Sequence, residues 1–320
     1  SGNEYVTVNG IQLVSQMKFD YESRSLYDIA IEVRDSQGVA LTQVFDLTVL
    51  NENDVPTTIT LSGETITENR VVGTLIGILD ANDEDGDDLL YRVTSGNSFV
   101  TVNGTQLVSA VNFDYESRST YEITIEVSDL NGGASSQGFT LIVRDENDVP
   151  SNITLSGTTI TENSVAETLI GILDAIDQDG DSLFYTVSSG NEIVSVNGTQ
   201  LWTQVSFDYE SRSTYEIVIE VRDSEGVAAT QAFTLTVLDD NDAPTTITIS
   251  QTTITENSVV GTLIGILDAT DPDGDSLVYT VTSGNEIVSV NGTQLLLAGS
   301  VDYELQNTYA FTIHVSDLRG

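Results

Sequence analysis

The side chains with the greatest chemical potential in this sequence are carboxylates, and they recur in groups at a fixed spacing. The string FDYE starts at Phe19, Phe113 and Phe207, with the variant VDYE at Val301, so successive copies are 94 residues apart. The string TEN, the acidic loops DEDGD, DQDGD and DPDGD, and Asn-Asp pairs before an apolar residue and Pro recur at the same interval. Carboxylate and amide oxygens in this density are the ligands that hard divalent cations prefer.

The composition excludes several other kinds of chemistry. The chain has 10 Lys or Arg against 50 Asp or Glu, a formal charge of -40, which disfavours nucleic acids and anionic membrane surfaces as partners. The chain has no cysteine, which excludes disulfides and thiolate catalysis. Its single histidine, His314, disfavours imidazole-based catalysis and metal sites built from several histidines. Carboxylate pairs such as Asp114 and Glu116 could hydrolyse glycosides, but the same pair recurs in every copy. We therefore expect no enzymatic activity.

The 94-residue interval predicts a tandem array of small domains, because it is too long for a solenoid unit and suits an autonomous domain. Starting each copy after the proline gives complete repeats at 57–150 and 151–244, with part-copies at 1–56 and 245–320. We expect the chain to be a piece of a longer array of such repeats.

Each copy has an all-β pattern. In 57–150 we expect seven strands near 59–66, 73–79, 89–94, 99–102, 105–109, 121–128 and 138–143. Apolar residues alternate with polar ones at 122–127, and Asn103-Gly104 predicts a tight hairpin. Seven short antiparallel strands in this length predict an immunoglobulin-like Greek-key β-sandwich in each repeat.

The order of the strands predicts where the acidic loops lie. If successive strands are antiparallel, successive loops alternate between the two ends of the sandwich. Glu68 and Asp114 then lie at the end where the chain leaves through 145–148, whereas Asp83 and Asp129 lie at the end where it enters. Acidic loops of two successive repeats would therefore converge on the linker between them. Like charges so close together need a cation, and calcium takes six to eight such oxygen ligands.

The same motifs carry a family resemblance. TEN, FDYE, the two aspartates of the acidic loop, the aspartate after the sixth strand and the linker DENDVP resemble the calcium motifs of cadherin repeats, in the same order along the whole chain. The absence of cysteine, the short linker and the near-identical copies look most like bacterial cadherin-like repeats of large surface adhesins. Val149 and Ala243 occupy the position where the family usually has a second Asn.

The resemblance implies two or three Ca²⁺ ions at each linker, held by a set of residues from both neighbouring repeats. At 51–54 the implied ligands are Asp20, Glu22, Asn53, Asp54, Asp83, Asp85 and Asp129. At 145–148 they are Glu68, Asp114, Glu116, Asp145, Asn147, Asp148, Asp177, Asp179 and Asp223. At 239–242 they are Glu162, Asp208, Glu210, Asp239, Asn241, Asp242, Asp271, Asp273 and Asp317. The first site is expected to be the weakest, because Asn51 replaces the leading Asp and the Glu of a first strand is not in the sequence.

Several alternatives remain open from the sequence alone. Each acidic loop could be only a solvated turn with Asp as turn former. The arginines of the YESRS strings, Arg24, Arg118 and Arg212, are expected to balance nearby carboxylates. For function, we expect a calcium-stiffened extracellular stalk of an adhesin, secreted or anchored at the cell surface. Its partners would be the neighbouring repeats of a longer chain. The alternatives are repeats that bind polysaccharide or like repeats on another cell, or accessory modules of a secreted polysaccharide-degrading enzyme.

Overall fold

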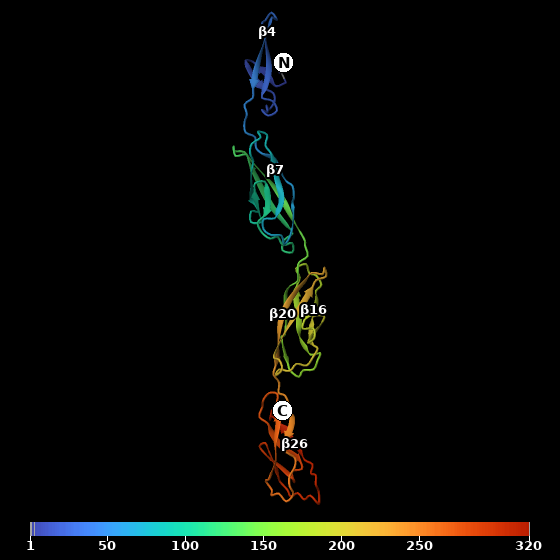
Figure 1. The fold of residues 1–320 in the computed structure, drawn as a ribbon. Helices are drawn as coiled ribbons and strands as arrows, with labels where there is room; N and C mark the ends of the chain where they lie inside the picture. Colours follow the sequence, from blue (N-terminus) through green and yellow to red (C-terminus); the bar gives the residue numbers. More distant parts are fainter. Residues whose placement is uncertain (1, 3, 320) are drawn as a thin grey trace. The chain divides into compact units, whose positions relative to one another are not determined.

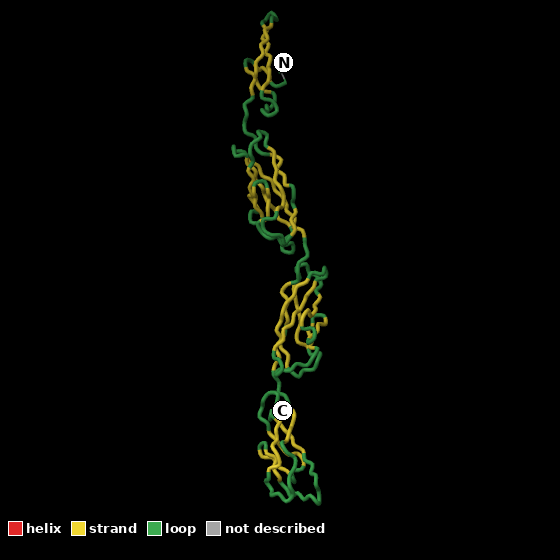
Figure 2. The backbone as a smooth tube through the Cα atoms, in the orientation of Figure 1, coloured by secondary structure: helices red, strands yellow, loops and turns green. Residues whose placement is uncertain are grey.

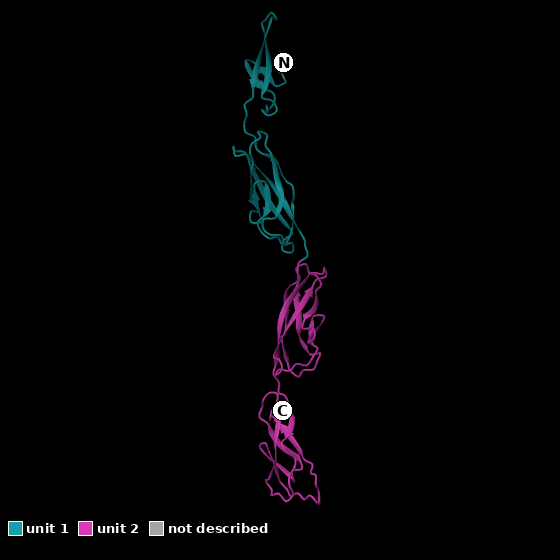
Figure 3. Ribbon diagram, viewed as in Figure 1, with its two compact units in different colours: residues 1–147 teal, residues 148–320 magenta. Residues whose placement is uncertain are grey.

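The structure is a computed structural model that describes residue 2 and residues 4–319, and it consists of strands joined by loops (Figures 1 and 2). The chain divides into two compact units, residues 1–147 and 148–320 (Figure 3). Among the described residues there is no helix long and apolar enough to cross a membrane.

Residues 57–150 form two four-stranded sheets. The strands are β5 (Thr57–Leu61), β6 (Thr65–Thr67), β7 (Leu75–Asn82), β8 (Leu90–Ser95), β9 (Val100–Asn103), β10 (Gln106–Ser109), β11 (Thr120–Ser128) and β12 (Ala134–Arg144). One sheet has the order β5-β7-β10-β9 and the other β6-β12-β11-β8. All pairs are antiparallel except β6 with β12, which is parallel.

The next segment repeats this topology. Its strands are β13 (Ser151–Leu155), β14 (Thr159–Thr161), β15 (Leu169–Ile176), β16 (Phe184–Ser189), β17 (Val194–Asn197), β18 (Gln200–Thr203), β19 (Thr214–Arg222) and β20 (Ala228–Leu238). The sheets have the orders β13-β15-β18-β17 and β14-β20-β19-β16. The prediction of all-β, immunoglobulin-like sandwiches is confirmed.

The outer segments contain the corresponding strands. Residues 1–56 carry the pairs β1 (Val6–Asn9) with β2 (Gln12–Ser15) and β3 (Leu26–Arg34) with β4 (Ala40–Thr48). After residue 244 the strands are β21 (Thr245–Ile249), β22 (Leu263–Thr270), β23 (Val278–Ser283), β24 (Val288–Asn291), β25 (Gln294–Leu297) and β26 (Thr312–Ser316). They form a β21-β22-β25-β24 sheet and a β23-β26 pair.

Each sandwich closes on an apolar core built from alternate residues of facing strands. In the segment 151–244, Leu201 of β18, Ile217 and Ile219 of β19, and Leu235 of β20 are fully buried in one cluster. The alternation that exposes one face of each strand and buries the other therefore appears in the structure as it does in the sequence. These cores hold the strands in place, and the acidic loops begin where the strands end, so the cores also position the acidic loops.

The first strand of each of the two complete repeats is divided, which refines the predicted strand at 59–66. β5 pairs with β7 in one sheet, and β6 pairs with β12 in the other, so the chain changes sheets between them. The change takes place at Gly63, where a Cβ would lie 2.6 Å from the carbonyl oxygen of Ile76. Seven strands per repeat remain when β5 and β6 are counted as halves of one strand.

The predicted hairpin is present, with its turn one residue further along. Asn103 pairs with Gln106, so the two turn residues are Gly104 and Thr105 rather than Asn103 and Gly104. Gly104 has φ of 62°, and a glycine with positive φ at the first central position is typical of a type II′ turn.

Candidate metal sites

The glutamate of TEN is positioned by a parallel strand pair. β14 runs parallel to β20, so both strands end at the same edge of the sheet, and Glu162 follows β14 directly beside the linker that follows β20. Its Oε1 accepts a hydrogen bond from the backbone N–H of Asp240 (2.9 Å), and its Oε2 accepts one from the N–H of Tyr209 (2.6 Å). Only 2% of Glu162 is exposed. The buried carboxylate thus joins the linker to the FDYE turn.

The FDYE motif is a turn anchored by its phenylalanine. Phe207 is buried against Ile160 and Val237, while the acidic residues after it lie in the turn. Asp208 Oδ1 accepts the N–H of Ser211 at 2.7 Å, which closes the turn. Glu210 is left exposed at its tip. The apolar half of the motif therefore sets the position of its acidic half.

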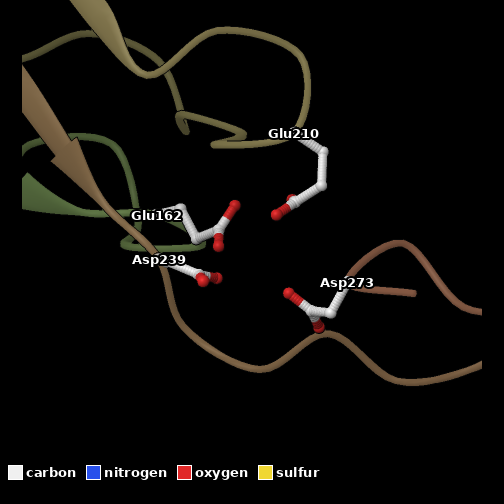
Figure 4. Close-up of side chains that lie close together, drawn as sticks. All are labelled: Glu162, Glu210, Asp239 and Asp273. Carbon is white, nitrogen blue, oxygen red and sulfur yellow. The ribbon is translucent and has the colours of Figure 1, made fainter. Parts of the chain in front are cut away.

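Four carboxylates meet at the linker 239–242. One carboxylate oxygen from each of Glu162, Glu210, Asp239 and Asp273 lies within 4.8 Å of the others, and the four carboxyl groups face a common space (Figure 4). Loss of surrounding water, followed by the charge of Asp273, raises the pKa of Asp239. The strand end, the FDYE turn, the linker and the following acidic loop each supply one member of this four-carboxylate cluster. Such a group of oxygens is able to bind a divalent cation.

The same linker is tied to the repeat that follows it. Asp273 Oδ2 accepts the N–H of Asp242 at 2.7 Å, and the side-chain amide of Asn241 donates to Asp317 Oδ2 at 2.8 Å. Asp317 is 5% exposed. Asp271 Oδ1 accepts the N–H of Asp275 at 3.1 Å, while its Oδ2 is buried without a hydrogen-bond partner among the described residues.

The first linker, within residues 1–147, has a related arrangement. The N–H of Asp54 donates to Asp85 Oδ2 (2.7 Å), and the amide of Asn53 donates to Asp129 Oδ2 (2.8 Å). Asp129 is 2% exposed, and its Oδ1 accepts three backbone N–H groups of the loop after it. Loss of surrounding water, with the charge of Asp85 as a smaller cause, raises the pKa of Glu22.

Two other residues predicted for the first linker bind their own loops. Both carboxylate oxygens of Asp20 accept hydrogen bonds from Ser23, from its N–H and its hydroxyl, each at 2.9 Å. Asp83 Oδ1 accepts the N–H groups of Asp85 (3.1 Å) and Asp87 (3.2 Å). Its Oδ2 is buried and has no hydrogen-bond partner within the part of the chain that the structure describes.

The residues predicted for 145–148 divide between the two units. In residues 1–147, the fully buried Glu68 accepts the N–H groups of Glu146 (2.9 Å) and Tyr115 (2.7 Å), as Glu162 does in its repeat. On this side Asp114 closes the FDYE turn through Ser117, Glu116 lies in that turn, and Asp145 and Asn147 follow β12. In residues 148–320, Asp179 accepts the N–H of Asp148 (2.6 Å), Asp177 that of Asp181 (3.1 Å) and Asp223 that of Val227 (2.8 Å). The assignment of these residues as ligands stays a prediction.

The asparagine of TEN is a linker contact that the sequence analysis missed. Asn163 has φ of 55°, a left-handed conformation that Asn tolerates better than most residues, and Asn69 and Asn257 share it. The Asn163 amide donates to Asp242 Oδ1 at 2.7 Å. This asparagine recurs in all three TEN strings, and that recurrence is the sequence signal that could have identified it as a structural residue.

The arginines of the YESRS strings contradict their predicted role. The guanidinium carbons of Arg24, Arg118 and Arg212 lie 4.5, 4.4 and 4.5 Å from the ring centroids of Tyr27, Tyr121 and Tyr215. Each Nε also donates to a backbone carbonyl two residues further on, at 2.7 Å. These arginines stack on aromatic rings because the turn places them over the first residues of the next strand.

Comparison with protein families gives two matches. Residues 157–238 match the family described as Cadherin domain, and residues 241–320 match the family described as Bacterial Ig domain. Each match covers about a quarter of the chain.

Curated proteins with similar sequences include protocadherins. Protocadherin Fat 4 of Homo sapiens is 27% identical over 347 residues, covering 95% of this chain and 7% of that protein. Protocadherin-1 of Homo sapiens is 27% identical over 335 residues, covering 93% of this chain and 31% of that protein. The chain thus spans only a small part of the relatives it matches.

Solved structures share the fold. Protocadherin Gamma B2 extracellular cadherin domains 1–5 align with a TM-score of 0.59 and 20% identity, covering 95% of this chain and 65% of that one. The protocadherin gammaB7 EC3–6 cis-dimer structure aligns with a TM-score of 0.58 and 22% identity, covering 98% and 84%. The sequence and structure comparisons together support cadherin-like tandem repeats with the fold of cadherin domains.

Proposed function

We propose that this chain is a calcium-binding repeat array in which Ca²⁺ ions at the linkers fix each repeat to the next. The observation that carries the proposal is the four-carboxylate cluster of Glu162, Glu210, Asp239 and Asp273 at the linker 239–242. The elements that supply it are a strand end, a turn, a linker and a loop of the following repeat. A cation bound there would hold all four together.

The donor set fits calcium. All members are oxygen ligands, and calcium accepts six to eight of them in flexible geometry, whereas Mg²⁺ demands near-octahedral coordination. Asp83, Asp177 and Asp271, which occupy the same position in three acidic loops, each have a buried Oδ2 with no hydrogen-bond partner among the described residues. A buried carboxylate oxygen without a partner is costly, and a bound cation would satisfy it. We propose two or three ions at each linker, with the residues predicted from the sequence as their ligands, including those at 145–148.

The array would serve as a stiff extracellular spacer in cell adhesion. The similarity to structures described as extracellular cadherin domains supports an extracellular location, where millimolar calcium suits sites of this type. The match of 241–320 to a Bacterial Ig domain supports a bacterial surface adhesin as the parent protein. The partners would be neighbouring repeats of a longer chain.

Carbohydrate binding has less support. That function would need rows of exposed aromatic residues on a sheet face. The exposed tyrosines belong to the FDYE and VDYE turns instead, and the exposed Phe45 and Phe184 are single residues on β4 and β16 and not rows. Association of like repeats with one another is the alternative that the cis-dimer description of one similar structure supports.

Small-angle X-ray scattering of the full chain tests the proposal. Addition of millimolar calcium to the chain in EDTA should increase the radius of gyration and sharpen the distance distribution, as flexible linkers become fixed. Magnesium at the same concentration controls for ionic strength. Identical scattering curves in EDTA and calcium would overturn the proposal.

A further inference from the structure

The first residue of the linker is an amide in one linker and a carboxylate in another, so its side chain can form different contacts. Asp239 begins the linker 239–242, whereas Asn51 begins the linker 51–54. The side-chain amide of Asn51 donates a hydrogen bond to Asp85 Oδ1 at 2.9 Å. The other oxygen of Asp85 accepts the N–H of Asp54 at 2.7 Å. Both oxygens of this carboxylate therefore accept hydrogen bonds from the linker itself.

At the linker 239–242 the equivalent contact is repulsive. Asp239 and Asp273 occupy the positions of Asn51 and Asp85, and their carboxylates belong to one cluster within 4.8 Å. The N–H of Asp242 still donates to Asp273 Oδ2 at 2.7 Å, so this backbone contact is common to both linkers. The side chain that begins the linker is an amide that donates a hydrogen bond to the neighbouring carboxylate in one case, and a second carboxylate in the other.

We propose that the Asn51 amide holds the linker 51–54 against the following repeat when calcium is absent. The inference rests on the proposed function at the other linkers. A hydrogen bond from an amide to a carboxylate is charge-assisted and stronger than one between neutral groups, and Asn51 brings one negative charge fewer to the site than an Asp would. The array then contains a joint at 51–54 that persists when calcium is removed and a joint at 239–242 that requires calcium. Withdrawal of calcium loosens the second joint and leaves the first in place.

Hydrogen–deuterium exchange of the full chain, in EDTA and in about 5 mM calcium, tests this difference, because that concentration saturates extracellular-type sites. The backbone amides of Asp54 and Asp242 are matched reporters, since each donates to an aspartate of the following repeat at the same distance. The Asp54 amide should keep its protection in EDTA. The Asp242 amide should lose protection by about tenfold or more, the change that accompanies loss of one hydrogen bond to a charged group.

Exchanging the two side chains should exchange the two behaviours. Asn51→Asp should make protection of the Asp54 amide depend on calcium, and Asp239→Asn should preserve protection of the Asp242 amide in EDTA. Asn97→Asp, at an exposed turn position, controls for the added charge. If Asn51→Asp leaves the Asp54 amide fully protected in EDTA, the inference about Asn51 is wrong. If the Asp242 amide of the unaltered chain does not respond to calcium, the proposed function fails instead, so the two failures are distinguishable.

Discussion

Replacement of Glu162 by Gln gives a sharp test of the cluster at 239–242. The two side chains have the same shape, but Gln has one acceptor oxygen where Glu162 uses two, for the N–H groups of Asp240 and Tyr209. One buried N–H would then face an amide NH₂ group, at a cost of about 1–3 kcal/mol. The substitution also removes one of the four carboxylates proposed to bind the cation. It should therefore lower both intrinsic stability and the response to calcium.

The size of the calcium response follows from mass action. A site with a Kd of about 10⁻⁴–10⁻³ M stabilises the folded state by about 1.4–2.7 kcal/mol at about 10 mM calcium. For a domain of this size, that corresponds to a rise in Tm of roughly 6–20 °C per site. A tenfold loss of affinity in Glu162→Gln removes about 1.0–1.3 kcal/mol of this gain. The calcium-induced rise in Tm should then be smaller by roughly 4–10 °C.

The single tryptophan makes the measurement local. Trp202 lies on β18, in the same sandwich as Glu162, so its fluorescence reports the unfolding of this segment within the full chain. Melts of the unaltered chain and of Glu162→Gln in EDTA and in calcium give the two responses, with the exposed Glu216→Gln as a matched control. A Glu162→Gln chain that is less stable in EDTA but gains the full calcium response would refute the reasoning. Glu162 would then support the fold and take no part in cation binding.

Three further outcomes follow from the structure. Removal from water and the charge of Asp273 raise the pKa of Asp239, so in EDTA acidification from neutral pH through that raised pKa should stabilise the linker 239–242. The hydrogen bond from the Asn53 amide is the largest cause that lowers the pKa of Asp129. The contribution of Asp129 to the stability of the linker 51–54 is therefore lost as the pH falls through that lowered pKa. If acidification in EDTA changes amide exchange in the same direction at both linkers, these signs are wrong. Ile219→Ala, at a fully buried core position, should cost about 2–5 kcal/mol in Trp202-detected melts, whereas the exposed Val165→Ala should cost less than about 0.5 kcal/mol. Gly77→Ala should cost about 1–3 kcal/mol, because its Cβ would lie 2.7 Å from the Gly63 carbonyl oxygen, whereas Gly138→Ala, with its nearest atom at 3.9 Å, should be tolerated in circular dichroism melts.

The sequence was sufficient to predict the features that depend on period and order. The 94-residue interval and the alternation of apolar residues predicted sandwiches of short strands. The alternation of loop ends then placed Glu68 beside both Tyr115 and Glu146, and Asp129 beside Asn53, as the hydrogen bonds show. These relations follow from strand direction alone, so they need no knowledge of side-chain packing.

The features that the sequence did not reveal depend on close approaches between distant segments. The first strand changes sheets around Gly63, where the backbone of Ile76 comes too close for a side chain, and nothing local in the sequence records that contact. Arg212 lies over Tyr215 rather than a carboxylate because of the turn geometry. The hydrogen bond of Asn51 to Asp85 spans 34 positions, so a substitution that looked like the loss of a ligand is in the structure a new contact.

The most direct test of the central claim is a calorimetric titration of the full chain with calcium at neutral pH, beside the same titration of a chain carrying Asp239→Asn and Glu210→Gln. The account predicts saturable binding of several ions with dissociation constants of about 10⁻⁴–10⁻³ M, and fewer ions bound by the double variant. Absence of saturable binding up to about 10 mM calcium, well above that range, would contradict it. The acidic loops would then be solvated turns of a cadherin-like array held together by its backbone alone.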